Sequence, residues 1–170
     1  MAERSTKTPI AAVDAKARRM RIVRRGLLGF WAIWTTIVLA TNLTDALKAL
    51  GVLPNSWSFS SGNYALLRNT IAVYQTPSWL AASLFGGIII WQALVATLYF
   101  RAAFSSSRGD LETLGFIQAF AASLGLWMAF MLADEVFLAY RVESTHRSVF
   151  TAQLLTLAVL WLLREPALRE

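Results

Sequence analysis

Several kinds of chemistry are excluded because the residues that they need are absent or rare. The chain of 170 residues contains no cysteine and a single histidine. Without thiolates it can form no disulfide, iron–sulfur cluster or cysteine-ligated zinc site, and it has no thiol nucleophile. The single histidine excludes a membrane haem held by two axial histidines. Phosphate-binding glycine loops, nucleophile elbows and zincin motifs are also absent, so we expect neither an enzyme nor a bound cofactor or metal.

Charged residues are scarce as well. They make up 15% of the chain, whereas 56% of the residues are hydrophobic and the mean hydropathy is +0.51. Soluble domains carry about 25% charged residues, so this chain has too few polar side chains to cover a water-soluble globule. It is also too apolar to be disordered. Seven Trp, ten Phe and four Tyr suit the two interfaces of a bilayer. We therefore predict an integral membrane protein whose surroundings are the lipid bilayer.

Four apolar stretches approach the length of about 20 residues that a membrane helix needs. Within a predicted membrane domain of residues 26–165, they cover about residues 26–46, 78–104, 111–133 and 148–163. The last stretch is the shortest. An open sheet fails because lipid offers no partners for unpaired backbone groups, and the stretches lack the alternation of barrel strands. The predicted fold class is an all-α integral membrane protein, an antiparallel bundle of four transmembrane helices.

Basic residues are distributed unequally around these stretches. The tail of residues 1–25 carries eight Lys and Arg, the second loop carries two and the C-terminal end two more, whereas the first and third loops together carry four. The positive-inside rule then places both termini in the cytoplasm of a cell with the protein in its inner membrane. The net charge of +6 faces the anionic inner leaflet and does not indicate nucleic-acid binding. We interpret the tail as uncleaved and helical from near Ala11, and residues 166–170 as a short cytoplasmic C-terminus.

The longest predicted loop, residues 47–77, lies on the outer side. Its first part is rich in turn residues. Apolar residues then recur at helical spacing from Tyr64 to Tyr74, with polar residues between them. This pattern predicts a short amphipathic helix in the membrane plane, capped by Asn63 and stopped by Pro77. Such a helix would act as a lid over the outer end of the bundle.

Small residues form two stripes along the third stretch. One stripe is Ala121, Gly125, Ala129 and Ala133, and the other is Gly115, Ala119 and Ser123. Small side chains allow helix backbones to approach closely in lipid, so both stripes predict helix packing.

Polar residues at membrane depth are candidates for function because they are costly in lipid. Gln92 lies near the middle of the second stretch, Trp127 near the middle of the third, and Gln153 in the outer half of the fourth. We expect the Gln92 amide and the Trp127 indole to face the bundle interior. They can serve as hydrogen bonds between helices or line a ligand pocket.

A second polar group lies where the predicted helices reach the outer membrane surface. Its members are Asn42, Asp45, Asp134, Glu135 and His146. Opposed acids with a histidine can bind a divalent cation or relay protons. Charges also collect at membrane helix ends without such a role. We predict a salt-bridged polar rim and no metal site.

Two of these regions carry short motifs. The first stretch ends in Asn-x-Thr-Asp at residues 42–45, and the third contains a mid-membrane Trp127 and closes in ADEVFLAY at residues 133–140. Over about residues 26–163 the chain resembles an uncharacterised proteobacterial family of small four-helix integral membrane proteins, a domain of unknown function. It departs from the family at Gln92, where members have Glu, and at residues 149–151, where they have Phe-Arg. The resemblance implies the topology and no activity, because the family's function is unassigned.

With no complete catalytic constellation, we expect a non-catalytic accessory or assembly subunit of a larger inner-membrane complex of the respiratory or photosynthetic kind, with other membrane subunits as partners. The alternative is a small transporter or ligand-binding sensor. In that case Gln92, Trp127, Asn42 and Asp45 would line an outward-opening pocket beneath the lid helix. A third alternative is an enzyme that acts on lipid or quinone through the outer acids.

Overall fold

The computed structural model describes the backbone of residues 9–105 and 110–163, and the side chains of residues 15–105 and 113–163. The start of the basic tail and the predicted C-terminal segment, residues 166–170, lie outside the described part. The elements are, in order, α1 (Pro9–Ala49), α2 (Asn63–Ile71), a 3-10 helix η1 (Ala72–Tyr74), α3 (Ser78–Phe104), α4 (Asp110–Val136) and α5 (Tyr140–Leu162).

Three of the described helices are long and apolar enough to cross a membrane. They are α1 over Ala15–Ala49, α3 over its whole length, and α4 over Thr113–Val136. The predicted class, an all-helical membrane protein, is therefore confirmed at this level. The fourth predicted stretch lies within α5, which begins about two turns earlier, at Tyr140. Those added turns contain Arg141, Glu143 and Arg147. Because of them, α5 is on average more polar than α3 and α4 and less polar than α1.

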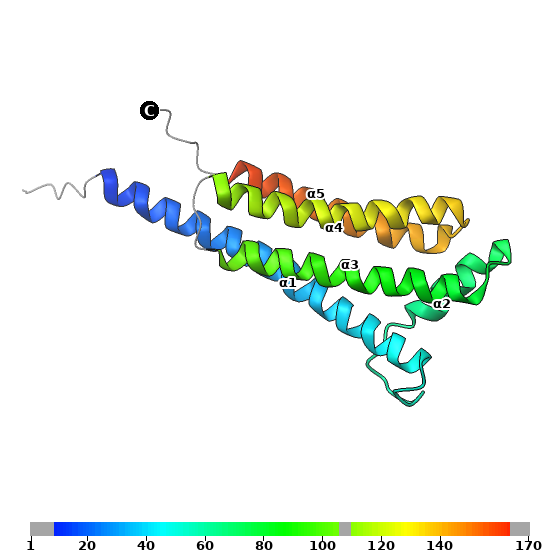
Figure 1. Cartoon of the computed structure of the whole chain (residues 1–170). Helices are drawn as coiled ribbons and strands as arrows, with labels where there is room; N and C mark the ends of the chain where they lie inside the picture. Colours follow the sequence, from blue (N-terminus) through cyan, green and yellow to red (C-terminus); the bar gives the residue numbers. More distant parts are fainter. Residues whose placement is uncertain (1–8, 106–109, 164–170) are drawn as a thin grey trace, which may run out of the picture.

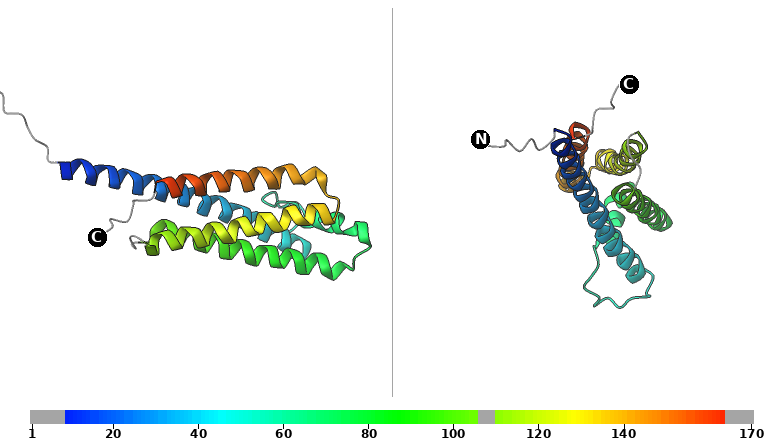
Figure 2. Two further views of the ribbon diagram at one scale, coloured as in Figure 1. Left: turned by 90° about the horizontal axis from the view of Figure 1, so that it is seen from above. Right: turned by 90° about the vertical axis from the view of Figure 1, so that its left-hand side faces the viewer.

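The four long helices run alternately up and down. Helix α1 packs on α3, α3 on α4, and α4 on α5. Figure 1 shows α3, α4 and α5 running nearly side by side, whereas α1 crosses them obliquely and moves away from α4 and α5 toward its C-terminal end. Figure 2 shows the same divergence along the bundle. Helix α2 lies at this wide end, against α1 and α3. We call this wide end of the bundle the α2 end, and we call the opposite end of the bundle the far end.

Tight packing is concentrated toward the far end. Its core contains the buried Trp31 from α1, Tyr99 from α3, Phe120 from α4 and Leu160 from α5. The rings of Tyr99 and Phe120 meet edge to face, with their centroids 5.2 Å apart. Ala119 is fully buried in the same core.

The two predicted stripes on the third stretch behave differently. Ala119 and Ser123 are buried, whereas Ala121 is exposed and Gly125 is half-buried. The first stripe nevertheless contacts α3, because a β-carbon at Gly125 would lie 3.5 Å from the Trp91 ring. The two stripes therefore differ in burial, but each packs against another part of the bundle.

The segment between α1 and α3 depends on two left-handed glycines. Gly51, with φ +74°, ends α1, and the Val52 N–H then donates to the Leu47 carbonyl at 2.9 Å. Gly62, with φ +73°, precedes α2 and occupies the cap position predicted for Asn63. Asn63 is the first helical residue instead. Its side chain makes a contact with another helix, as described below.

Candidate ligand-binding cavity

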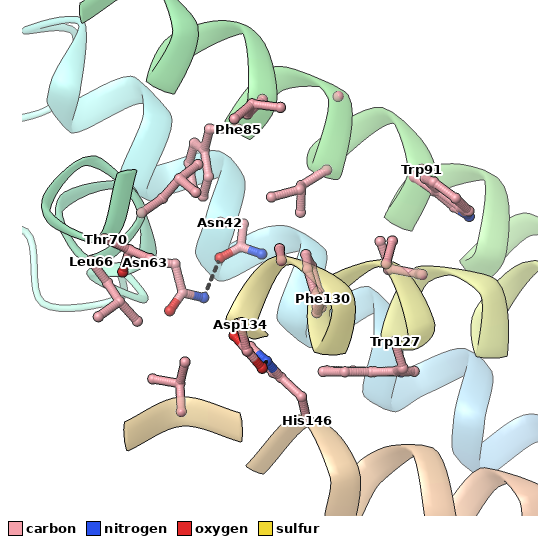
Figure 3. Close-up of a pocket in the computed structure, with 18 of the residues that line it drawn as sticks. Asn42, Asn63, Leu66, Thr70, Phe85, Trp91, Trp127, Phe130, Asp134 and His146 are labelled. Atoms are coloured by element: carbon pink, nitrogen blue, oxygen red, sulfur yellow. Dashed lines mark hydrogen bonds and ion pairs between the residues drawn. The ribbon is translucent and has the colours of Figure 1, made fainter. Parts of the chain in front are cut away.

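A cavity of about 550 Å³ opens at the α2 end, where α1 diverges from the other helices. Its walls come from α2 and from all four long helices (Figure 3). Most of the lining is apolar, and the larger side chains are Leu66, Phe85, Ile88, Trp91, Trp127 and Phe130. Ligand pockets in proteins are typically of this size and largely apolar, with a few placed polar groups.

One group of polar residues joins three helices through their side-chain amides. Asn63 of α2 donates to the Asn42 carbonyl oxygen at 2.8 Å, and Asn42 of α1 donates to Gln92 Oε1 at 2.9 Å. Asn42 and Gln92 are buried, with exposed fractions of 2% and 3%. Gln92 thus faces the interior, where the sequence places it. Figure 3 shows the Asn63–Asn42 bond at the edge of the cavity. The amide chain positions α2 against α1 and α3.

Asp45 lies one turn beyond Asn42 on α1, but it does not line the cavity. Its carboxylate accepts hydrogen bonds from the Ser60 hydroxyl at 3.0 Å, the Ser61 hydroxyl at 3.2 Å and the Tyr64 backbone N–H at 2.7 Å. Because Gly62 offers no capping side chain, Asp45 caps the N-terminus of α2 from another helix. Its role is therefore to hold the wall of the cavity.

A second polar pair connects α4 and α5. The His146 Nδ1 atom lies 2.6 Å from a carboxylate oxygen of Asp134, and Asp134 is only 4% exposed. The His146 ring packs against Phe130 and Trp127, with centroid distances of 5.0 and 5.8 Å. Figure 3 shows Asp134 and His146 pointing toward each other at the cavity wall. A buried carboxylate is tolerated here because the imidazole pairs with it.

The cavity thus brings together five of the seven residues singled out from the sequence: Asn42, Gln92, Trp127, Asp134 and His146. The other two, Asp45 and Glu135, lie outside it, and Glu135 is exposed.

The predicted polar rim is present only in part. Arg147 pairs with Glu143 on its own helix rather than with an acid of another helix. Among the side chains that the structure describes, no three His, Asp or Glu residues come close enough to hold a metal ion.

A buried polar group next to the far-end core contains Gln153, which the sequence singled out at membrane depth, and Tyr99 and Thr35, which it did not. Ser123 of α4 donates to Gln153 Oε1 of α5 at 2.8 Å. The fully buried Tyr99 hydroxyl lies near the Ser123 side chain, but the contact falls outside hydrogen-bond geometry. Thr35 Oγ1 and Gln153 Nε2 are buried without partners as well. The sequence did not identify Tyr99, because a tyrosine near an Arg in an apolar stretch fits a residue anchored at the membrane interface as well as it fits a buried one.

The cavity wall also contains residues that sequence reasoning did not select, among them Trp91, Phe130 and Leu66. Their apolar side chains carry no signal that separates a cavity wall from a lipid-facing surface. Asn63 could have been found, because it is the polar residue at the start of the predicted amphipathic segment.

Comparison with protein-family models, with characterised proteins and with solved structures finds no match to this chain. The resemblance to the uncharacterised proteobacterial family stays a prediction.

Proposed function

We propose that this protein is a ligand-binding membrane protein that takes up an amphipathic small molecule in the cavity at the α2 end. The observation that supports this proposal is the cavity itself: about 550 Å³ with mostly apolar walls and a few buried polar side chains. Cavities with this composition are typical binding sites in helical bundles. The sequence analysis gave ligand binding as the alternative function, with a pocket beneath the lid helix as the binding site.

The cavity walls suggest how such a molecule would lie. Its apolar part would contact side chains such as Phe85, Ile88 and Phe130, which offer dispersion contacts but no hydrogen bonds. Its polar part would lie near the amide chain of Asn42 and near the His146–Asp134 pair. Helix α2, held by Asp45, forms the wall nearest the end of the bundle. No chemical step is required for this function.

The same proposal includes a topology. Helix α5 would be the fourth span, since it runs antiparallel beside α4. Helix α2 would lie in the membrane plane on the outer side, and the excess of basic residues would keep both termini in the cytoplasm of the cell inner membrane. Because the chain has no cysteine, single-cysteine variants test this cleanly. Ser58→Cys should react with an impermeant maleimide in intact cells, and Ser5→Cys should react only after permeabilisation; the reverse pattern would contradict the topology.

Two adjacent glycines of α3 provide a matched test of ligand binding. Gly87 lines the cavity and Gly86 does not, and a β-carbon at either position would meet nothing within 4 Å. Gly87→Phe should place a ring in the cavity and obstruct it, whereas Gly86→Phe should leave it open. The measurement is lipid extraction and mass spectrometry of protein purified in a mild detergent. We expect a co-purifying small molecule with wild type and Gly86→Phe that is lost with Gly87→Phe. Equal amounts with both variants would refute the proposal.

The accessory-subunit hypothesis uses the same preparation. Many large apolar side chains are exposed along the helices, among them Ile90, Phe104 and Leu132. Lipid or neighbouring subunits can cover them equally well. Larger subunits that co-purify in fixed stoichiometry would support the subunit function.

A further inference from the structure

Two N–H groups on largely buried residues of the cavity wall, Gln92 and Trp127, have no hydrogen-bond partner within the described residues. Gln92 uses its Oε1 to accept the bond from Asn42, which leaves its Nε2 amino group unpaired. The Trp127 indole N–H is likewise unpaired, although only 8% of the residue is exposed. Both residues line the cavity. A molecule that displaces water from this cavity must supply an acceptor to these groups, because an N–H group that is desolvated without a partner is costly.

The second indole of the wall is already satisfied. The Trp91 indole N–H donates to the Ala122 carbonyl at 3.0 Å. Among the two indoles of the wall, the N–H of Trp127 is therefore the unpaired one, and Gln92 adds an amide N–H. The hydroxyls of Thr70, Ser83 and Thr145 also line the cavity. The Gln92 and Trp127 groups can donate to an acceptor atom of a bound molecule.

The charges around the cavity restrict what that molecule is. Asp134 in the wall is paired with His146, so the site offers no unpaired cation to a carboxylate or phosphate. Among the described lining residues there is no Lys or Arg. An anionic group would be desolvated without a counter-charge, which is strongly unfavourable. An uncharged acceptor oxygen avoids this cost.

We propose that the cavity binds an uncharged lipid-like molecule with a carbonyl oxygen, and that Gln92 and Trp127 donate hydrogen bonds to that carbonyl. This inference rests on the proposed ligand-binding function and adds the chemical class of the ligand. The carbonyl can belong to the ring of an alkyl quinone or to the ester of a neutral glyceride, which share the same acceptor chemistry. The apolar tail fills the rest of the cavity.

The test uses the full chain in lipid nanodiscs and three probes of similar tail length. The probes are 2-decyl-1,4-benzoquinone, monodecanoylglycerol and decylbenzene, which has no carbonyl. Binding is measured by isothermal titration calorimetry, with empty nanodiscs subtracted. We expect the better carbonyl probe to bind roughly tenfold more tightly than decylbenzene, since a hydrogen bond to a buried donor contributes about this factor. The tighter of the two carbonyl probes identifies the source of the carbonyl.

Trp127→Phe removes one donor and keeps the aromatic ring. It should lower the affinity for the carbonyl probe several-fold and leave that for decylbenzene unchanged, so the comparison is made within one folded variant. Trp91→Phe is the matched control, because the N–H that it removes is already bonded to Ala122. It should leave the preference for the carbonyl probe unchanged.

The outcomes separate this inference from the proposed function. If decylbenzene binds as tightly as both carbonyl probes, or if Trp127→Phe leaves the carbonyl preference intact, the assignment of the carbonyl is wrong while ligand binding stands. If none of the three probes binds and no small molecule co-purifies, the proposed function fails together with the inference.

Discussion

Replacing Asp45 by alanine should release α2 from the rest of the bundle. The Asp45 carboxylate is 8% exposed and accepts three hydrogen bonds from the segment that begins α2. The shortest of these, at 2.7 Å, comes from the Tyr64 backbone N–H, which has no other acceptor at the helix start. The Ser60 and Ser61 hydroxyls can turn toward water after the substitution, but the Tyr64 N–H cannot.

The size of the effect follows from these bonds. Loss of a helix N-cap costs about 0.5–2 kcal/mol, and a buried donor left without a partner costs about 1–3 kcal/mol. These two values describe the same N–H group and are not added. We expect Asp45→Ala to lower the free energy that holds α2 in place by about 2 kcal/mol. Asp45→Asn keeps one acceptor oxygen and should cost about half as much.

Limited proteolysis of the loop before α2, around residues 50–62, measures this local opening. When opening is fast relative to cleavage, the cleavage rate follows the population of the open form, so a loss of about 2 kcal/mol raises the rate about 30-fold. Unfolding of the whole bundle, followed by circular dichroism in an SDS titration, should change much less. Glu135→Ala is the control, because this acid is also near the α2 end but exposed. The reasoning is refuted if Asp45→Ala is cleaved no faster than Glu135→Ala.

Three further sets of substitutions test the packing, each by SDS-titration stability in detergent. Tyr99→Phe removes a buried hydroxyl whose contact with Ser123 falls outside hydrogen-bond geometry, so it should change the stability by no more than about 1 kcal/mol; a larger loss would show that the hydroxyl is bonded to Ser123. Ala119→Leu should destabilise the bundle by about 1–3 kcal/mol because it overfills the far-end core, whereas Ala121→Leu on the exposed face of α4 should change little. Asp134→Leu and His146→Leu should each lower the stability of the α4–α5 pair. The double variant should lose less stability than the two single variants together, with a coupling free energy of about 1–3 kcal/mol. Additive losses would show that the two side chains are not coupled.

The extent of some helices was predicted from the sequence. Helix α3 covers Ser78–Phe104, the same range as the second predicted stretch, because a mostly apolar run between Pro77 and the serines at 105–107 leaves little choice of boundaries. The segment from Asn63 is helical, as its periodicity predicts. The fourth predicted stretch, about residues 148–163, corresponds to the apolar part of α5, and the helix begins about two turns earlier. Hydropathy marks where a helix becomes apolar and not where it begins.

The candidate site was predicted less completely. Asp134 and Glu135 were selected together, yet the first lines the cavity and the second is exposed, since one residue step turns a helix by about 100°. Asn42 and Asp45 were also grouped, and they point to different partners. No sequence pattern separates these cases when both faces of a helix are apolar.

The sequence by itself determined that this protein belongs in a bilayer, that it is helical, and that its few polar side chains at membrane depth must find partners. In water a buried helix face differs from an exposed one in polarity, and periodicity reveals it. In lipid the surroundings and the core are equally apolar, so helix rotation leaves no such trace. Only the tertiary structure, through the oblique course of α1, decided that Asn42, Gln92 and Asn63 meet, that Asp45 caps α2, and that a cavity opens between them.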